Sequence, residues 1–243
     1  MPAFQGCTST SIKQKLIITA MKTLKILGIP LLLSLFIVFA SATDVSKETE
    51  RVNKATEVLK TFRGMKESIP HELIATYKGI VIIPGLINAS FGIGGKRGKG
   101  IAIVRLPNGK WSDPVFITLT GGSVGFQAGV QSIDLVLVFR HSGALTKVKN
   151  GDFTIGGDVS AAAGPVGRST SANTDYKLEA EVYSYSRSRG LFAGISINGS
   201  NLSIDKSADA NFYGPAFTSQ DLFAYGKSKN ESIVALKTTL AGM

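Results

Sequence analysis

The sequence predicts an α+β fold: a glycine-rich, mainly antiparallel, strongly curved or barrel-like sheet with an N-terminal amphipathic helix and short C-terminal helices. Two observations support this class. Apolar runs of strand length follow one another from residue 79, separated by glycine and proline. Segments with helical spacing lie before and after them. Hydrophobic residues make up 44% of the chain and charged residues 18%, which is typical of a folded domain and argues against disorder.

A secretory signal is predicted near the start of the chain. Lys22 and Lys25 provide its charged region, and an apolar stretch follows over 26–39. The small residues of 40–42 then have the character of a signal-peptidase site. We therefore expect the protein to be exported and to be periplasmic or secreted.

This signal sets the expected division of the chain. Residues 1–20 do not resemble a leader, and we interpret them as an over-extended start. Residues 21–42 are the predicted signal peptide, cleaved near Ala42, and 43–243 are expected to form one domain. The alternative is that 26–42 stays in place as a membrane anchor.

Residues 44–69 are predicted to form an amphipathic helix. Their apolar residues recur at helical spacing on one side, and Pro70 ends the pattern. Two interpretations remain open. The apolar side packs against the sheet, or it lies on a membrane surface, in which case Phe62, Met65 and Lys66 contact lipid.

Six apolar runs predict the strands that follow. They cover 79–84, a segment ending at Ile93, 101–105, 115–120, 123–130 and 133–139. In 123–130, glycines and Gln127 occupy alternate positions, which predicts the close approach of another backbone or of a ligand. Asp134 is the sole acid of its run, so its carboxyl group must find hydrogen-bond partners or stay protonated. We predict a structural role for it, with ligand contact as the alternative.

A hairpin over 178–197 and two short helices complete the predicted domain. Strand alternation places four candidate structural or ligand-contacting side chains on one face of the hairpin, namely Tyr183, Tyr185, Arg187 and Arg189. The first helix is expected to be capped near Thr218 or Ser219. The second is expected to start near Asn230.

The main concentration of positive charge lies in the glycine-rich segment 94–100. It holds Lys96, Arg97 and Lys99 between two apolar runs, which predicts a hairpin tip with its cations in solvent. The tip is either a plain soluble turn or a site where cations and backbone amides contact phosphates. Aromatic residues that would stack on bases do not interleave with these cations, so we expect no nucleic-acid partner.

Catalytic and cofactor motifs are not matched. The phosphate-binding loop lacks its first glycine, because Asp221 stands at that position, and the dinucleotide pattern has Arg97 in place of its third glycine. His71 and His141 are the only histidines, and no nucleophile elbow accompanies them. Cys7 is the only cysteine, which excludes an internal disulfide. We therefore predict no catalytic residues, no metal site, no cofactor and no enzymatic activity.

Motifs in consistent order over more than half of the chain resemble the SYLF family of lipid-binding proteins, whose yeast members are actin regulators. The matching segments are KGIVIIP at 78–84, the glycine-rich 91–100, LPNGKWSDP at 106–114, 121–129, Asp134 before its apolar run, 153–167, and YSYSRSRGLFAG at 183–194. This resemblance is to an exported, bacterial-type member. It implies binding of phosphoinositides or other anionic lipids, with an amphipathic helix at the N-terminal side of the domain.

The charge of the chain agrees with an anionic partner. Of the net charge of +10, four lysines without an acid in 1–42 account for +4, which leaves +6 on the remainder. We therefore expect non-catalytic binding to anionic membrane lipids through Lys96, Arg97, Lys99 and the helix over 44–69. The alternatives are a structural or protein-interaction module, with an envelope or actin-type partner, and a carrier of an enclosed apolar ligand.

Overall fold

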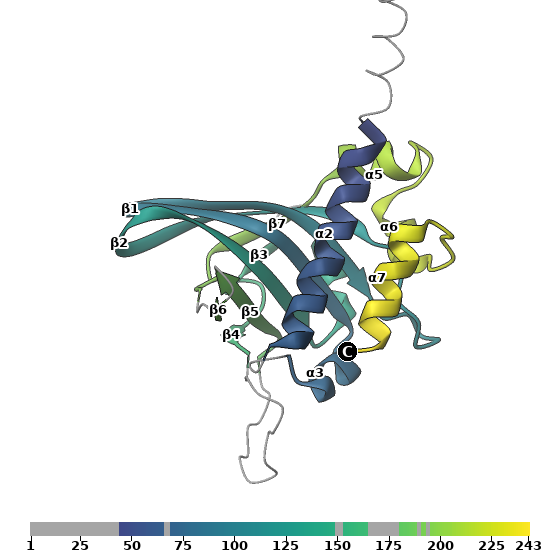
Figure 1. The fold of residues 1–243 in the computed structure, drawn as a ribbon, viewed down its shortest axis with the longest axis horizontal. Helices are drawn as coiled ribbons and strands as arrows, with labels where there is room; N and C mark the ends of the chain where they lie inside the picture. The colour runs from purple at the N-terminus through teal and green to yellow at the C-terminus, as the bar shows by residue number, and fades with distance from the viewer. Residues whose placement is uncertain (1–43, 66–68, 149–152, 165–179, 189–190, 193–194) are drawn as a thin grey trace, which may run out of the picture. The chain divides into compact units, whose positions relative to one another are not determined.

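Two long strands form the frame of the computed structural model, which describes residues 44–65, 69–148, 153–164, 180–188, 191–192 and 195–243. β1 (Gly79–Val104) and β2 (Val115–Phe139) pair antiparallel from one end to the other (Figure 1). The register shifts twice, between Ile83 and Leu86 and between Ser90 and Gly92. The six predicted runs are therefore parts of two continuous strands, and the irregularities at these shifts bend them.

The ribbon of β1 and β2 curls until β1 contacts itself, and glycines permit this contact. A Cβ atom on Gly100 would lie 2.1 Å from the carbonyl oxygen of Ile82, and one on Gly98 would lie 2.5 Å from Cγ2 of Ile83. Only glycine allows such an approach. A close approach was also predicted for 123–130. A Cβ on Gly129 would have no neighbour within 4 Å, and the side chains of 123–128 lie outside the described residues.

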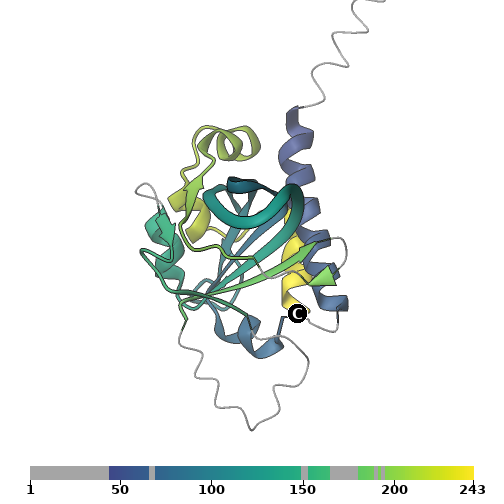
Figure 2. The ribbon, with the colours of Figure 1, turned by 90° about the vertical axis from the view of Figure 1, so that its left-hand side faces the viewer.

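Five short strands complete a seven-stranded sheet. They are β3 (Phe153–Ile155), β4 (Ala161–Ala163), β5 (Val182–Ser188), β6 (Leu191–Phe192) and β7 (Ser200–Ile204). The order is β3-β7-β2-β5-β4, with β1 paired to β2 and β6 paired to β5. The β4–β5 pair is parallel and the others are antiparallel. The predicted α+β class and the mainly antiparallel, strongly curved sheet are confirmed (Figure 2).

Helices pack on this sheet. They are α2 (Asp44–Gly64), α3 (His71–Thr76), α4 (Ser142–Lys147), α5 (Lys206–Tyr213), α6 (Ser219–Ala224) and α7 (Glu231–Ala241). α2 and α7 lie side by side in both ribbon views (Figures 1 and 2). Thr218 caps α6 and Asn230 caps α7, as predicted. α5 was not predicted, and Pro70 precedes α3 instead of ending α2.

Strand alternation divides the core between the two faces of the sheet. Ile80 and Ile82 pack with α2, α3 and α7, while their neighbours Val81 and Ile83 pack with α4 and α6. Each of these side chains is fully buried, and such burial stabilises the fold by about 1.5–3 kcal/mol per side chain. The first β1 run is therefore apolar on both faces because both faces are covered.

Residues Lys47–Met243 form one compact unit. The predicted over-extended start and signal peptide, residues 1–42, lie outside the described residues. Within the part of the chain that the structure describes, no helix combines the length and the apolar character needed to cross a bilayer.

Candidate functional site

The predicted cationic hairpin tip does not exist, because residues 94–100 lie within β1. Lys96, Arg97 and Lys99 face Gly121, Thr120 and Thr118 of β2 in the register. Gly98 and Gly100 permit the crossing of β1 over itself, and the segment does not form a turn. The three cations therefore stand along a strand, where alternation sends them to opposite faces.

Lys96 points into the protein. It is 5% exposed, and its Nζ donates a hydrogen bond of 2.5 Å to the carbonyl oxygen of Ser196. Burial lowers its pKa below the ordinary value for a lysine. The side chain is thus unavailable to a phosphate at the surface, and Lys96 no longer fits the proposed lipid contact.

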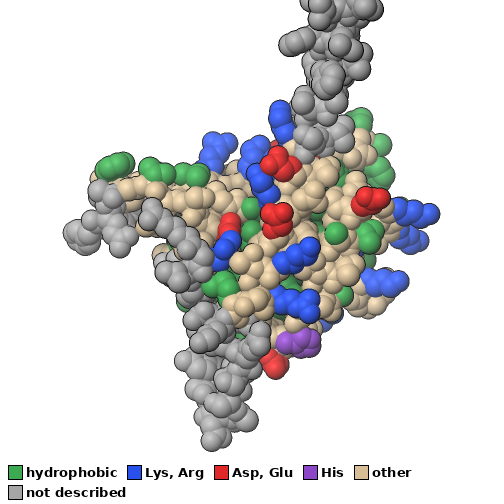
Figure 3. Space-filling view, in the orientation of Figure 1, with side chains coloured by type: hydrophobic (Ala, Val, Ile, Leu, Met, Phe, Trp, Pro, Cys, Tyr) green, Lys and Arg blue, Asp and Glu red, His purple; other side chains and the backbone are tan. Residues whose placement is uncertain are grey.

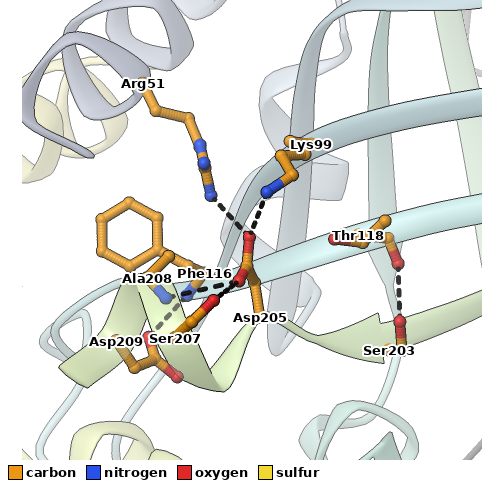
Figure 4. A network of polar contacts seen from close by, with 9 residues as sticks. All are labelled: Arg51, Lys99, Phe116, Thr118, Ser203, Asp205, Ser207, Ala208 and Asp209. Carbon is orange, nitrogen blue, oxygen red and sulfur yellow. Dashed lines mark hydrogen bonds and ion pairs between the residues drawn. The ribbon is translucent and has the colours of Figure 1, made fainter. Parts of the chain in front are cut away.

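Arg97 and Lys99 lie on the opposite, exposed face of β1. The Lys99 ammonium is 2.9 Å from a carboxylate oxygen of Asp205, and the Arg51 guanidinium of α2 is 3.3 Å from the same oxygen (Figure 4). Asp205 also caps α5 through its bond from the amide of Ala208. The cluster therefore joins α2, β1 and α5, and it retains one positive charge beyond the acid it binds.

Two buried acids at this junction have opposite pKa shifts. Burial alone would raise the pKa of Asp205, but hydrogen bonds from Lys99, Ser207 and the amide of Ala208 lower it to about 2. For Asp209, burial outweighs the hydrogen bonds from the Phe116 amide and the Ser219 hydroxyl, and it raises the pKa to about 6. Hence Asp205 is ionised at neutral pH, whereas Asp209 titrates at a pH slightly below neutral.

The apolar side of α2 belongs to the core. Phe62 is fully buried among the side chains that join α2 to the sheet, and Met65 is partly buried against the same cluster. Lys66 lies outside the described residues. Of the two interpretations of this helix, packing against the sheet is the one observed, and Phe62 is inaccessible to lipid in this conformation.

The predicted face of β5 is also structural where it is described. Tyr183 and Tyr185 are buried in the core beneath α2. Arg187 forms an ion pair with Asp134, which also accepts a hydrogen bond of 3.0 Å from the amide of Gly85. Both carboxylate oxygens of Asp134 thus have partners at the first register shift of β1. Arg189 and the side chain of Gln127 lie outside the described residues.

An exposed apolar surface that the sequence pattern did not predict lies where the ribbon bends. Four large hydrophobic side chains stand there, and we call them the apolar bend: Ile87, 46% exposed, Phe91, 74%, Ile93, 83%, and Val130, 62%. Figure 3 shows hydrophobic side chains along the part of the ribbon that reaches away from the helices. The alternation of Phe91 and Ile93 with glycine was the available signal, but it was interpreted only as the end of an apolar strand.

Groups suited to catalysis are not assembled in the part of the chain that the structure describes. Its His, Cys, Asp and Glu residues include no group that could hold a metal ion. His141 is paired with Glu181 through Nδ1 at 2.8 Å, on the surface. Asp134, the acid that would be needed for a catalytic triad with His141 and Ser142, is instead bound to Arg187.

Among the pockets formed by described residues, one has a cationic wall. It has a volume of about 490 Å³ and lies beside Trp111. Arg105 stacks over the Trp111 ring, 4.6 Å from its centre, and Lys237 is 2.5 Å from the buried carboxylate of Asp113. These cations are therefore engaged in holding the 105–114 connection against α7. The second pocket, about 480 Å³, is lined by α5 and the start of α6.

The fold and the exposed groups of β1 define an α+β binding module built on one curled ribbon. A family model described as Ysc84, Las17-binding protein actin regulator, matches residues 120–243. The chain belongs to this family, the Ysc84 or SYLF family, so the predicted family membership is confirmed.

Curated relatives agree with this membership. SH3 domain-containing YSC84-like protein 1 of Xenopus laevis is 38% identical over 168 residues, which cover 66% of this chain and 50% of that protein. Its Homo sapiens counterpart is 37% identical over 179 residues, covering 71% and 51%. LAS seventeen-binding protein 3 of Saccharomyces cerevisiae is 34% identical over 176 residues, covering 69% and 38%. The chain thus spans about half the length of the YSC84-like relatives and less of the yeast protein.

Proposed function

We propose that this protein binds anionic lipid surfaces without catalysis, through the exposed face of β1. The observation that carries the proposal is the charge of the ribbon around its bend. Segments 84–100 and 117–133 contain three bases and no acid. Two of the bases, Arg97 and Lys99, are exposed on the face that also carries Phe91 and Ile93. A surface that combines cations with nearby apolar groups suits a bilayer with anionic headgroups.

The electrostatic contribution follows from these two side chains. Arg97 has no ion pair among the described residues, and the side chain of Lys99 is half exposed although it binds Asp205. A base near an anionic membrane contributes about 1 kcal/mol. Loss of two such bases therefore corresponds to roughly 20- to 30-fold weaker binding. The attraction must weaken at high salt, because ions screen exposed charges over about 10 Å at moderate ionic strength.

Vesicle co-sedimentation tests the proposal. The protein is mixed with vesicles of phosphatidylcholine alone, or of phosphatidylcholine with phosphatidylserine, at low and at high salt. We expect binding to the anionic vesicles that high salt reduces. Equal binding to both kinds of vesicle, or binding that does not depend on salt, would contradict the electrostatic mechanism.

Matched charge reversals locate the site. Arg97→Glu with Lys99→Glu is compared with Lys227→Glu and Lys229→Glu, which changes the net charge equally at exposed positions before α7. We expect the β1 pair to lower affinity for anionic vesicles at least tenfold, and the control pair to lower it much less. Equal losses would show that net charge, not this face of β1, governs binding.

A protein partner is the second candidate, and the family description favours it. The matching model describes Las17-binding actin regulators. If the module itself binds filaments, it should co-sediment with actin filaments in lipid-free buffer. Absence of co-sedimentation at protein concentrations that saturate anionic vesicles would exclude direct filament binding by this chain.

Export is a separate proposal. It is supported by the basic, apolar and small-residue order of 21–42. Mass spectrometry of the mature N-terminus tests it, and the expected start is Thr43. A mature chain that begins upstream of Thr43 would contradict cleavage at this position.

A further inference from the structure

We propose that the apolar bend inserts among the lipid acyl chains while Arg97 and Lys99 stay at the level of the phosphates. This inference rests on the proposed lipid-binding function and adds its mechanism. Four of the seven large hydrophobic residues that are exposed in the described chain belong to this bend. Such a concentration at one place is unusual for a soluble surface, where exposed apolar side chains are scattered singly.

The strand register orders these side chains along the ribbon. From Gly92 to Ala102 the pairing of β1 with β2 is regular, so Ile93, Gly95, Arg97 and Lys99 share one face. The observed exposure follows this alternation, because Lys96 and Gly98, which lie between them, and Gly100, which follows, are buried. The face is therefore apolar near the bend and cationic farther along the same strand.

The spacing along β1 matches the depth of a membrane interface. Ile93 and Arg97 are four residues apart, which corresponds to about 13 Å of extended strand. Surface-bound helices bury their apolar face about 5–10 Å into the boundary between headgroups and acyl chains. With Ile93 at that depth, the flexible side chain of Arg97 reaches the phosphates. The arrangement thus complements both the headgroup region and the upper acyl-chain region of an anionic bilayer.

A bilayer suits this surface better than a protein does. A stable protein interface needs about 800 Å² on each partner. A large aromatic side chain buries only about 150–250 Å². Phe91 is the only aromatic residue of the four, and each of the four side chains is already partly covered. The four side chains alone therefore expose less area than one side of a standard protein interface, whereas a lipid surface has no such minimum.

Site-specific labels test the insertion. Cys7 is the only cysteine and is changed to Ser, after which single cysteines at Ile93 and at Asn108 are each labelled with an environment-sensitive fluorophore. Asn108 is exposed at the connection between β1 and β2, at the other end of the ribbon. On phosphatidylserine-containing vesicles we expect a blue shift at position 93, with quenching by lipids brominated in the upper acyl chain, and neither effect at position 108.

The outcomes separate this inference from the proposed function. If the protein sediments with anionic vesicles but the label at 93 stays in water, the function stands and the insertion is wrong. If it does not sediment, both fail. A blue shift at 93 that rises with protein concentration in lipid-free buffer would indicate self-association through the bend and would also overturn the insertion.

Polar substitutions give an independent test. Phe91→Ser with Ile93→Ser should weaken binding to phosphatidylserine-containing vesicles at high salt at least tenfold, because only the apolar contribution resists screening. The control is Phe217→Ser with Val234→Ser, which removes exposed apolar side chains elsewhere. Retention of high-salt binding by the bend variant, or an equal loss in the control, would overturn the proposal.

Discussion

The apolar side of α2 and the apolar bend of β1 and β2 look alike in the sequence and differ in the structure. Both are hydrophobic surfaces with basic residues nearby. The α2 side chains Val52, Leu59 and Phe62 are fully buried against the sheet. At the bend, Phe91 and Ile93 are among the most exposed apolar side chains described. The helix that family resemblance favours as a lipid contact is therefore a core element, and a strand provides the exposed apolar surface.

The comparison shows what hydrophobic periodicity can establish. It identifies a side of an element that avoids water, but it does not identify what covers that side. For α2, the sheet is long enough to cover the helix, and α7 lies beside it (Figure 1). The bend reaches beyond the helices, so its side chains have no described cover. Tertiary arrangement, not local pattern, decides which surface meets a partner.

The largest expected difference between the two regions is in stability. Phe62→Ala should lower the free energy of unfolding by about 3–5 kcal/mol, because it opens a cavity in a packed core. Phe91→Ala should change it by less than about 0.5 kcal/mol, because the ring is mostly in solvent. Chemical and thermal unfolding measure both, with a melting-temperature loss of roughly 10 °C for Phe62→Ala. Similar losses for the two variants would mean that the bend is covered in solution, which would contradict the comparison.

The second prediction concerns the curl of the ribbon, because the crossing of β1 over itself sets the buried part of the ribbon apart from the exposed bend. Gly100→Ala should destabilise the protein by about 3 kcal/mol, because the added Cβ would lie against the Ile82 carbonyl and the overpacking cannot relax easily. Gly95→Ala is the matched control, since its Cβ would find only the Gly121 carbonyl oxygen, 3.8 Å away. Equal stability of the two variants, measured by denaturant unfolding, would mean that β1 does not cross itself.

Much of the fold follows from local pattern. The helix over α2, the strand content of 79–139 and the caps at Thr218 and Asn230 were predicted because each depends on neighbouring residues. The continuity of β1 was not predicted, because glycine-rich segments usually indicate turns. Here Gly98 and Gly100 instead permit a contact with Ile82 and Ile83, residues distant in the sequence.

The candidate site was predicted only in part, for the same reason. Segment 94–100 was correctly selected as a place where exposed cations lie, since Arg97 and Lys99 are both exposed. The burial of Lys96 depends on the carbonyl of Ser196, one hundred positions away. The exposure of Phe91 depends on where the ribbon bends. Neither the contact with Ser196 nor the position of the bend can be predicted from the residues next to Lys96 or Phe91.

The smallest effect concerns the junction that holds α2. The folded-state pKa of Asp209 is raised to about 6, so its contribution to stability is complete below its ordinary value of 3.8 and is lost as the pH rises through 6. Between pH 4 and pH 7, the free energy of unfolding of the protein should fall by on the order of 2 kcal/mol relative to that of Asp209→Asn, whose side chain stays neutral. Urea unfolding across this range measures the difference. Asp205 has a pKa of about 2, so its own titration affects stability only at pH values below this range.

This titration also tests whether α2 takes part in lipid binding. Asp209 accepts a hydrogen bond from the Phe116 amide. The guanidinium of Arg51 in α2 lies over the Phe116 ring, 5.2 Å from its centre. Burial disfavours the ionised carboxylate although the Phe116 amide and Arg51 favour it, so ionisation of Asp209 should destabilise the junction that holds α2 and leave the bend unchanged. Vesicle affinity should not follow the titration. If affinity rises through pH 6 in the protein but not in Asp209→Asn, release of α2 contributes to binding, and the division between a buried helix and a binding strand is wrong.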